Sequence, residues 1–129
     1  MLLLDTCALI FDALTPKRLS ARTRALVDHE AEAGALAISD ISLWEVAMLV
    51  ERGRLDPGTD AASFCRLAIS ARALTVLPIT VEIAARTAAL ALHGDPADRL
   101  IVATAIEHRA TLVTTDQRLL ACSAVRTVR

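Results

Sequence analysis

The chain has 129 residues, of which 54% are hydrophobic, and its net charge is −1 at neutral pH. A chain of this length and hydrophobic content can bury one core, so we expect a single domain over residues 1–129. Its only aromatic residues are Phe11, Trp44 and Phe64, which excludes an RNA-binding surface that stacks bases on aromatic rings.

The cysteines and the apolar runs indicate the compartment. Cys7, Cys65 and Cys122 have no paired spacing and form no Cys/His zinc-site pattern, which favours a reducing environment. The opening "MLLL" meets Asp5 at once, which is too short for a signal-peptide core. No apolar run approaches the roughly 18 residues that cross a bilayer. We therefore expect a cytoplasmic protein without a membrane partner.

Short apolar runs alternate with helical patterns along the chain. In chain order, these patterns predict a strand at 2–5, a helix at 20–33, a strand at 36–39, helices at 39–52 and 60–72, a strand at 74–78, helices at 80–92 and 95–109, and strands at 111–115 and 125–128. Strands that are apolar on both faces are typical of a parallel sheet with covered faces. The sequence therefore predicts an α/β fold with a central parallel sheet flanked by helices.

Four acidic residues, called the four acids below, lie where a strand ends or where the next helix begins. They are Asp5, Glu45, Asp98 and Asp116. In parallel α/β folds these positions share one edge of the sheet, where ligands bind. Carboxylates crowded at one edge repel one another unless a cation neutralises them. A set of oxygen ligands without His or Cys suits Mg²⁺ or Mn²⁺.

Each of the four acids also has a structural interpretation at the start of a helix. The capping assignments are Asp5 and Asp116 as caps of the helices that follow them, Ser42 with Glu45 as a capping box, and Asp95 with Pro96 as cap and first residue of a helix whose third residue is Asp98. Asp95 and Asp98 would then divide the work, because Asp95 holds the helix start while Asp98 projects toward the metal.

Four further residues are candidates for supporting roles near the acids. Thr6 and Thr114 offer hydroxyls that either orient a water or phosphate or bond local backbone. Arg99 either pairs with an aspartate, which we favour, or contacts phosphate. His93 either contacts substrate or, as we favour, bonds backbone in a loop. Without Asp95 and the four acids the net charge would be +4 rather than −1, so the remaining surface can attract phosphates.

Four segments together resemble the ordered motifs of PIN-domain proteins, specifically the VapC-like toxins of bacterial toxin–antitoxin modules. The segments are "LLLDT" at the start, "SLWEVAMLVERGRL" at 42–55, "HGDPADRLIVATA" at 93–105 and "TLVTTDQRL" at 111–119. The resemblance implies a Mg²⁺-dependent endoribonuclease, a homodimer, and a small VapB-like antitoxin that blocks the site. It also implies that the four acids form the catalytic site, and Asp95 matches the family's "DPxDR" pattern as either a ligand or a cap.

The residue types fit metal-dependent cleavage of RNA. A divalent ion would activate water and neutralise charge on the attacked phosphate, so the carboxylates need only hold the metal. We expect Asp5 to be the central ligand, Asp98 and Asp116 to be direct or water-mediated ligands, and Glu45 to be a ligand or to orient the water.

Two other classes of protein compete with this interpretation. A phosphotransfer receiver domain needs a lysine at the end of a late strand, whereas the sole lysine is Lys17. A catalytically inactive PIN-like binding module is the remaining alternative. Small apolar residues in "TAALALHG" and in the helix expected at 80–92 indicate a face that packs against a second subunit.

Overall fold

The computed structural model describes residues 1–92 and 94–129, so the proposed roles of His93 lie outside the described residues. A parallel sheet forms the centre, with strand order β3-β2-β1-β4-β5. Its described strands are β1 (Leu2–Leu4), β2 (Leu36–Ser39), β3 (Thr75–Leu77), β4 (Thr111–Val113) and β5 (Thr127–Val128). The predicted α/β fold is confirmed, with each strand close to or within its expected range.

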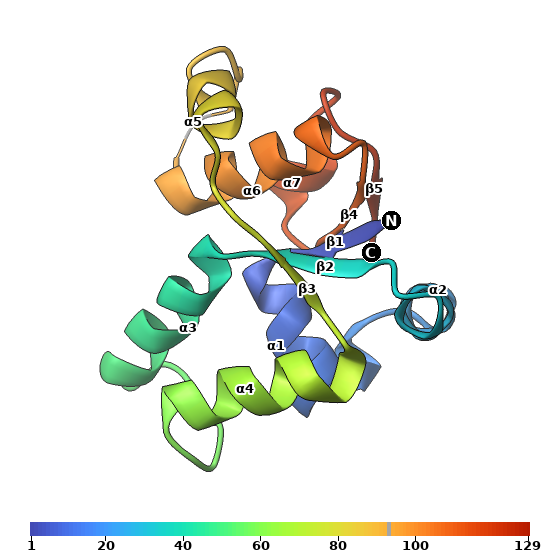
Figure 1. The fold of residues 1–129 in the computed structure, drawn as a ribbon, viewed down its shortest axis with the longest axis vertical. Coiled ribbons are helices and arrows are strands. Elements are labelled where there is room, and N and C mark those ends of the chain that lie inside the picture. The colour runs from blue at the N-terminus through green and yellow to red at the C-terminus, as the bar shows by residue number, and fades with distance from the viewer. Residues whose placement is uncertain (93) are drawn as a thin grey trace.

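The described residues also form seven α-helices and one short 3₁₀ helix, η1 (Pro16–Arg18). The α-helices are α1 (Thr6–Leu14), α2 (Ala21–Glu32), α3 (Ile41–Glu51), α4 (Ala61–Arg72), α5 (Val81–Thr87), α6 (Pro96–Glu107) and α7 (Gln117–Leu120). Helices α1, α2 and α4 lie on one side of the sheet, and α6 and α7 lie on the other (Figure 1). No described helix has both the length and the apolar character that crossing a membrane requires.

Two hydrophobic clusters cover the two faces of the sheet. Leu2 and Leu4 of β1 belong to the cluster on the side of α1, α2 and α4, whereas Leu3 belongs to the cluster that contains α6 and α7. This division follows from the strand period of two, which turns successive side chains to opposite faces. Because both faces are buried, every residue of β1 must be apolar, as the sequence "LLL" has it.

The prediction of a helix at 80–92 is wrong after residue 87. Helix α5 ends at Thr87, whose backbone carbonyl accepts hydrogen bonds from Leu90 N at 3.3 Å and from Arg99 Nη2 at 2.7 Å. The chain then leaves the helix and buries Leu92 in the cluster on the side of α6. A contact with α6 therefore ends a helix that local composition would extend.

The strand order creates a crossing point next to β1. From β1 the chain builds β2 and β3 on one side, and it then returns to place β4 on the other side of β1. Ligand sites of open α/β sheets lie at the carboxyl ends of the strands beside such a crossing point. Asp5 directly follows β1, and Asp116 follows β4, so two of the four acids flank this point.

Candidate active site

Asp5 joins β1 to α1 and is buried, with 5% of its surface exposed. Its carboxylate accepts a hydrogen bond from Ala8 N at 2.7 Å, so the predicted capping role is confirmed. Burial raises the pKa of Asp5, and the nearby charge of Asp116 acts in the same direction, whereas hydrogen bonds from Thr114 and Ala8 oppose the rise. Asp5 thus holds the helix start and places a carboxylate at the crossing point.

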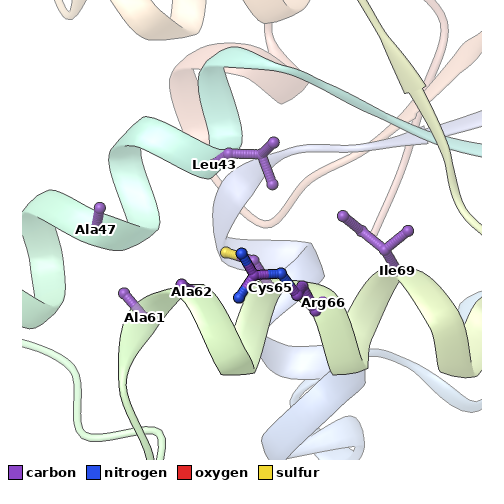
Figure 2. Close-up of a pocket in the computed structure, with 7 residues that line it drawn as sticks. All are labelled: Leu43, Ala47, Ala61, Ala62, Cys65, Arg66 and Ile69. Atoms are coloured by element: carbon purple, nitrogen blue, oxygen red, sulfur yellow. The ribbon is translucent and has the colours of Figure 1, made fainter.

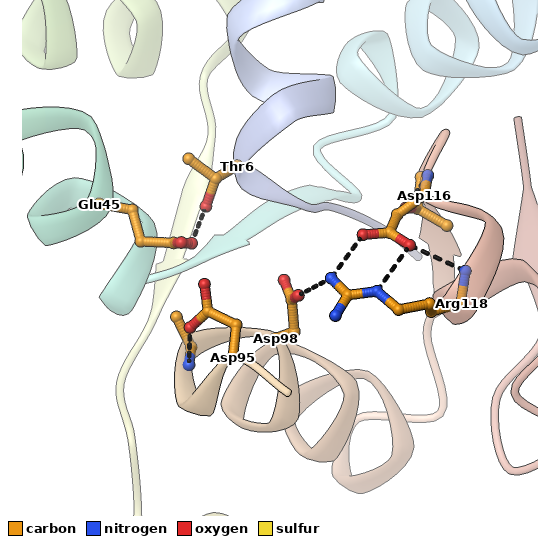
Figure 3. Close-up of polar contacts among 8 residues, drawn as sticks. Thr6, Glu45, Asp95, Asp98, Asp116 and Arg118 are labelled. Carbon is orange, nitrogen blue, oxygen red and sulfur yellow. Dashed lines mark hydrogen bonds and ion pairs between the residues drawn. The ribbon is translucent and has the colours of Figure 1, made fainter. Parts of the chain in front are cut away.

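Glu45 lies on α3 and is held from α1. The Thr6 hydroxyl donates a hydrogen bond to Glu45 Oε1 (Figure 3). Thr6 Oγ1 also lies 2.9 Å from Ser42 Oγ. Because a hydroxyl has one proton, Ser42 donates to Thr6 in this chain of hydrogen bonds. The capping-box interpretation is wrong, since α3 begins after Asp40 and has no side-chain cap. Glu45 therefore faces α1 rather than its own helix terminus.

Asp95 and Asp98 divide their roles at the start of α6. Asp95 caps the helix by accepting a hydrogen bond from Ala97 N at 2.9 Å, with Pro96 as the first helical residue. Asp98 follows in the first turn, and Figure 3 shows its carboxylate between Asp95 and Arg118. The apolar face of α6 is buried from Ile101 onward, which fixes the position of this first turn.

Asp116 caps α7 and contacts an arginine on the same short helix. It accepts a hydrogen bond from Arg118 N at 2.8 Å, and Arg118 Nη2 lies 3.1 Å from Asp116 Oδ2. The same Nη2 lies 3.3 Å from Asp98 Oδ2, so the guanidinium stands between carboxylates of two elements (Figure 3). The hydrogen bond from Arg118 lowers the pKa of Asp116. Arg118 is a site residue that its local sequence does not predict, and its position two residues after a helix cap is the only local signal.

The pKa shifts indicate that the acids lie close enough to repel one another. Burial raises the pKa of Asp98 to about 6, and the charges of Asp95, Glu45 and Asp116 add to the rise while Arg118 opposes it. Burial also raises the pKa of Glu45, and nearby acidic charges add to that rise. The structure thus brings together carboxylates from the ends of β1 and β4 and from α3 and α6.

Cys7 lies on α1, and the charges of the four acids affect the pKa of its thiol. Desolvation raises the pKa of its thiol to about 11, and each of the four acids contributes to the rise. The cysteine therefore remains a protonated thiol at neutral pH, which leaves no thiolate nucleophile beside the acids. This matches a site whose chemistry depends on carboxylates.

The donor set fits a hard divalent cation. Carboxylate oxygens are the preferred ligands of Mg²⁺ and Mn²⁺, and the mutual repulsion of the four acids would be relieved by bound positive charge. Within residues 1–92 and 94–129, no group of three or more Asp, Glu, His or Cys side chains is close enough together to hold a metal ion as the side chains stand. Arg118 supplies the positive charge between Asp98 and Asp116 in this structure.

The other supporting residues have mainly structural contacts. Thr114 Oγ1 accepts a hydrogen bond from Asp116 N at 3.1 Å, so it shapes the turn after β4 and also bonds Asp5. The favoured ion pair of Arg99 with an aspartate is wrong among the described residues, because its guanidinium donates to the Thr87 carbonyl. Arg99 therefore stabilises the end of α5.

A separate hollow of about 370 Å³ lies between α3 and α4 (Figure 2). Its lining is apolar except for Arg66, and it includes Leu43 and Ala47 of α3. These two residues are four apart on one helical face, whereas Glu45 projects from the far side of the same helix. The hollow therefore does not belong to the acidic site.

Comparison with known proteins identifies the family. The family model of the PIN domain matches residues 2–123. The chain is also 40% identical over 119 residues to Ribonuclease VapC22 of Mycobacterium tuberculosis, covering 91% of this chain and 88% of that protein.

Solved structures share the fold along the whole chain. The crystal structure of VapBC2 from Rickettsia felis bound to a promoter DNA fragment matches with a TM-score of 0.74 and 20% identity, covering 99% of this chain and 98% of that chain. FitAcB from Neisseria gonorrhoeae matches with a TM-score of 0.65 and 24% identity, covering 100% of this chain and 97% of that chain. With the family match over residues 2–123 and the parallel sheet that carries the acids, this chain belongs to the PIN domain family.

Proposed function

We propose that this chain is a metal-dependent endoribonuclease and the toxin of a toxin–antitoxin pair. The observation that carries the proposal is the meeting of carboxylates at one sheet edge, where burial and the charges of Asp95, Glu45 and Asp116 raise the pKa of Asp98 to about 6. Acids held together against their mutual repulsion are typical of a site that binds a cation. The 40% identity to a protein named as a ribonuclease supports RNA as the substrate.

Each of the four acids has a distinct task in this proposal. Asp5 is the central ligand, because it is the most deeply placed carboxylate and is fixed by its bond to Ala8 N. Asp98 and Asp116 bind the ion directly or through water, and Glu45 binds it or orients the attacking water. Mg²⁺ or Mn²⁺ would supply an activated water and charge neutralisation at the phosphate.

The reaction is hydrolysis of one phosphodiester bond. The oxygen of water bonds to phosphorus, the bond from phosphorus to the 3′-oxygen breaks, and that oxygen leaves as a 3′-hydroxyl after gaining a proton. The products are a 5′-phosphate end and a 3′-hydroxyl end. Attack by the ribose 2′-hydroxyl would instead leave a cyclic phosphate, so the ends distinguish the two routes.

The proposed partners follow from the relatives. Several structural neighbours are complexes of VapC-type chains with a second protein, including VapBC from Salmonella typhimurium bound to DNA. We infer a VapB-like antitoxin that covers the acidic edge, and a homodimer of this chain. The net charge of the chain is +4 when Asp95 and the four acids are left out of the count. This positive charge outside the acidic site favours attraction of RNA phosphates.

The test is cleavage of single-stranded RNA by the purified chain without antitoxin. We expect cleavage with Mg²⁺ or Mn²⁺, none with EDTA, and 5′-phosphate ends. Asp5→Asn, Glu45→Gln, Asp98→Asn and Asp116→Asn should each slow cleavage by orders of magnitude. Asp60→Asn is the matched control, because Asp60 caps α4 through Ser63 N at 2.8 Å without belonging to the acidic site.

Asp95→Asn should have a milder effect than the four acids. An asparagine still accepts the hydrogen bond from Ala97 N that caps α6. Undiminished cleavage in EDTA, or full activity of Asp5→Asn, would overturn the metal-nuclease proposal. The catalytically inactive binding module would then be the better description.

A further inference from the structure

We propose that Arg118 acts as an internal counter-cation that occupies the place of the divalent ion between Asp98 and Asp116 and competes with it. The inference rests on the proposed function, because it concerns the ion that the four acids would hold. Its basis is the shared position of one guanidinium nitrogen, Arg118 Nη2, which lies 3.3 Å from Asp98 Oδ2 and 3.1 Å from Asp116 Oδ2.

Three parts of the chain contact the guanidinium of Arg118. Besides its contacts to α6 and to the end of β4, Arg118 Nε lies 3.4 Å from Asp116 Oδ1. Its Nη1 lies against Gly94, where an added Cβ would stand only 2.6 Å from that nitrogen. A glycine just before α6 therefore leaves the space that the guanidinium fills.

The contact relieves a repulsion that would otherwise remain in the metal-free chain. Asp98 carries the repulsion of Asp95, Glu45 and Asp116, and Arg118 is the cation that opposes these charges. A divalent ion bound by Asp98 and Asp116 needs the same oxygens, and its charge would repel the guanidinium. The two cations therefore exclude one another between these carboxylates.

Arg118 is free to leave this position. Its side chain is 57% exposed, and it extends from α7, a helix of four residues at the surface. By contrast, Arg72 is 31% exposed and its partner Asp12 is only 5% exposed. The Arg118 contacts thus have the character of a reversible ion pair, in which each exposed pair contributes little.

Removal of the guanidinium has two opposite expected effects. Arg118→Gln should bind Mn²⁺ about three to ten times more tightly, because the ion no longer displaces an existing ion pair. The same variant should melt at a lower temperature without metal, because the acids lose their counter-cation. Arg118→Lys should fall between the two proteins, since it keeps the charge but loses the planar contact to two carboxylates.

The experiment is isothermal titration of Mn²⁺ into the metal-free full chain, together with thermal unfolding in EDTA and at increasing Mn²⁺. Arg86→Gln is the matched control, because it also removes one arginine from an exposed ion pair, with Glu107 at 2.7 Å, on the α5 side of α6. The control should bind Mn²⁺ as the wild type does. Tighter binding by Arg118→Gln with a larger Mn²⁺-induced rise in melting temperature supports the inference.

Mn²⁺ binding by Arg118→Gln that is equal to or weaker than that of the wild type would overturn the proposed competition. If the wild type binds Mn²⁺ and cuts RNA while Arg118→Gln shows unchanged affinity, only the competition is wrong and the proposed function stands. If neither protein binds Mn²⁺ and the wild type cuts no RNA, both are wrong. Binding by Arg118→Gln alone would support the competition in its strongest form.

Discussion

Thr6 and Glu45 are 39 residues apart in sequence, yet the Thr6 hydroxyl donates a hydrogen bond to the Glu45 carboxylate. This bond ties the start of α1 to α3 and lowers the pKa of Glu45 against the effect of burial. One small polar side chain thus helps to keep an acid ionised at the proposed site. Thr6 is a positioning residue in this scheme, because it acts through Glu45.

Thr6→Val should separate positioning from packing. Valine nearly preserves the shape of threonine but cannot donate to Glu45, so the pKa of Glu45 should rise. A hydrogen bond to a charged group is worth about 1.5 kcal/mol, which corresponds to a shift of roughly one pH unit in the titration of Glu45. The measurement is the cleavage rate in saturating Mn²⁺ as a function of pH. The rate profile should move to higher pH.

Thr6→Ser is the control for this change. Serine retains the hydroxyl and should keep both the rate and the pH profile close to those of the wild type. A Thr6→Val protein with unchanged rate and unchanged profile would show that Glu45 does not depend on the hydroxyl.

Two substitutions of Asp5 should separate its role as the cap of α1 from the effect of its buried charge. Asp5→Asn keeps the acceptor for Ala8 N but removes a buried charge whose pKa is raised by burial, so metal-free stability should be equal or higher. Asp5→Ala also removes the cap and should be less stable than Asp5→Asn by about 1 kcal/mol. Both variants should lose RNA cleavage. Thermal unfolding in EDTA measures the stability difference.

A marked loss of metal-free stability in Asp5→Asn would contradict this account. It would mean that the carboxylate charge itself stabilises the fold, and that repulsion among the acids is weak. Asp60→Asn again provides the comparison, because it changes an exposed helix cap outside the site.

Much of the sheet and the edge position of two candidate acids follow from local sequence. Runs such as "LLL" and "LAIS" are apolar on both faces, and that pattern is typical of strands covered on both sides. An acid directly after such a run must lie at the carboxyl edge, which is how Asp5 and Asp116 are predicted. The edge position of these two residues depends only on chain direction and strand period.

Contacts between distant segments account for what the sequence does not predict. The sequence predicts a helix after the Asp5 cap but not the extent of α1, because "TCALIFDAL" is nearly continuously apolar. Arg118 reaches Asp98, which lies 20 residues away, through a long side chain whose direction no local pattern indicates. The end of α5 depends on Arg99, which reaches back from α6 to the Thr87 carbonyl.

The proposed homodimer predicts a role for the exposed end of α5. Val81 opens this helix with 82% of its surface exposed, which is unusual for a β-branched apolar residue without a partner. Val81→Glu should turn a dimer at tens of micromolar into a monomer in light scattering. Leu67→Glu is the control, because Leu67 is 66% exposed on α4, on the other side of the sheet, and should leave the dimer intact. A wild-type monomer would count against the dimer.

The raised pKa of Asp98 predicts that metal-free stability falls as the pH rises from about 4 to 6. Desolvation and the charges of Asp95, Glu45 and Asp116 raise this pKa from 3.8 to about 6 in the folded protein. Below pH 4 the carboxyl is protonated in both the folded and unfolded states, so it contributes no difference. Between the two values the unfolded chain releases the proton first, so the folded state binds more protons and loses stability with rising pH.

Asp98→Asn isolates this effect, because an amide does not titrate. In EDTA, the variant should gain stability over the wild type across that pH range, by an amount on the order of 2 kcal/mol that stays constant above pH 6. Asp60→Asn should behave oppositely, because the pKa of Asp60 is lowered, so its charge stabilises the fold above its titration range. Denaturant unfolding at pH 4, 5, 6 and 7 measures both differences. A stability difference between Asp98→Asn and the wild type that does not change with pH would show that Asp98 carries no raised pKa, and the repulsion among the four acids would then be too weak to favour a bound cation.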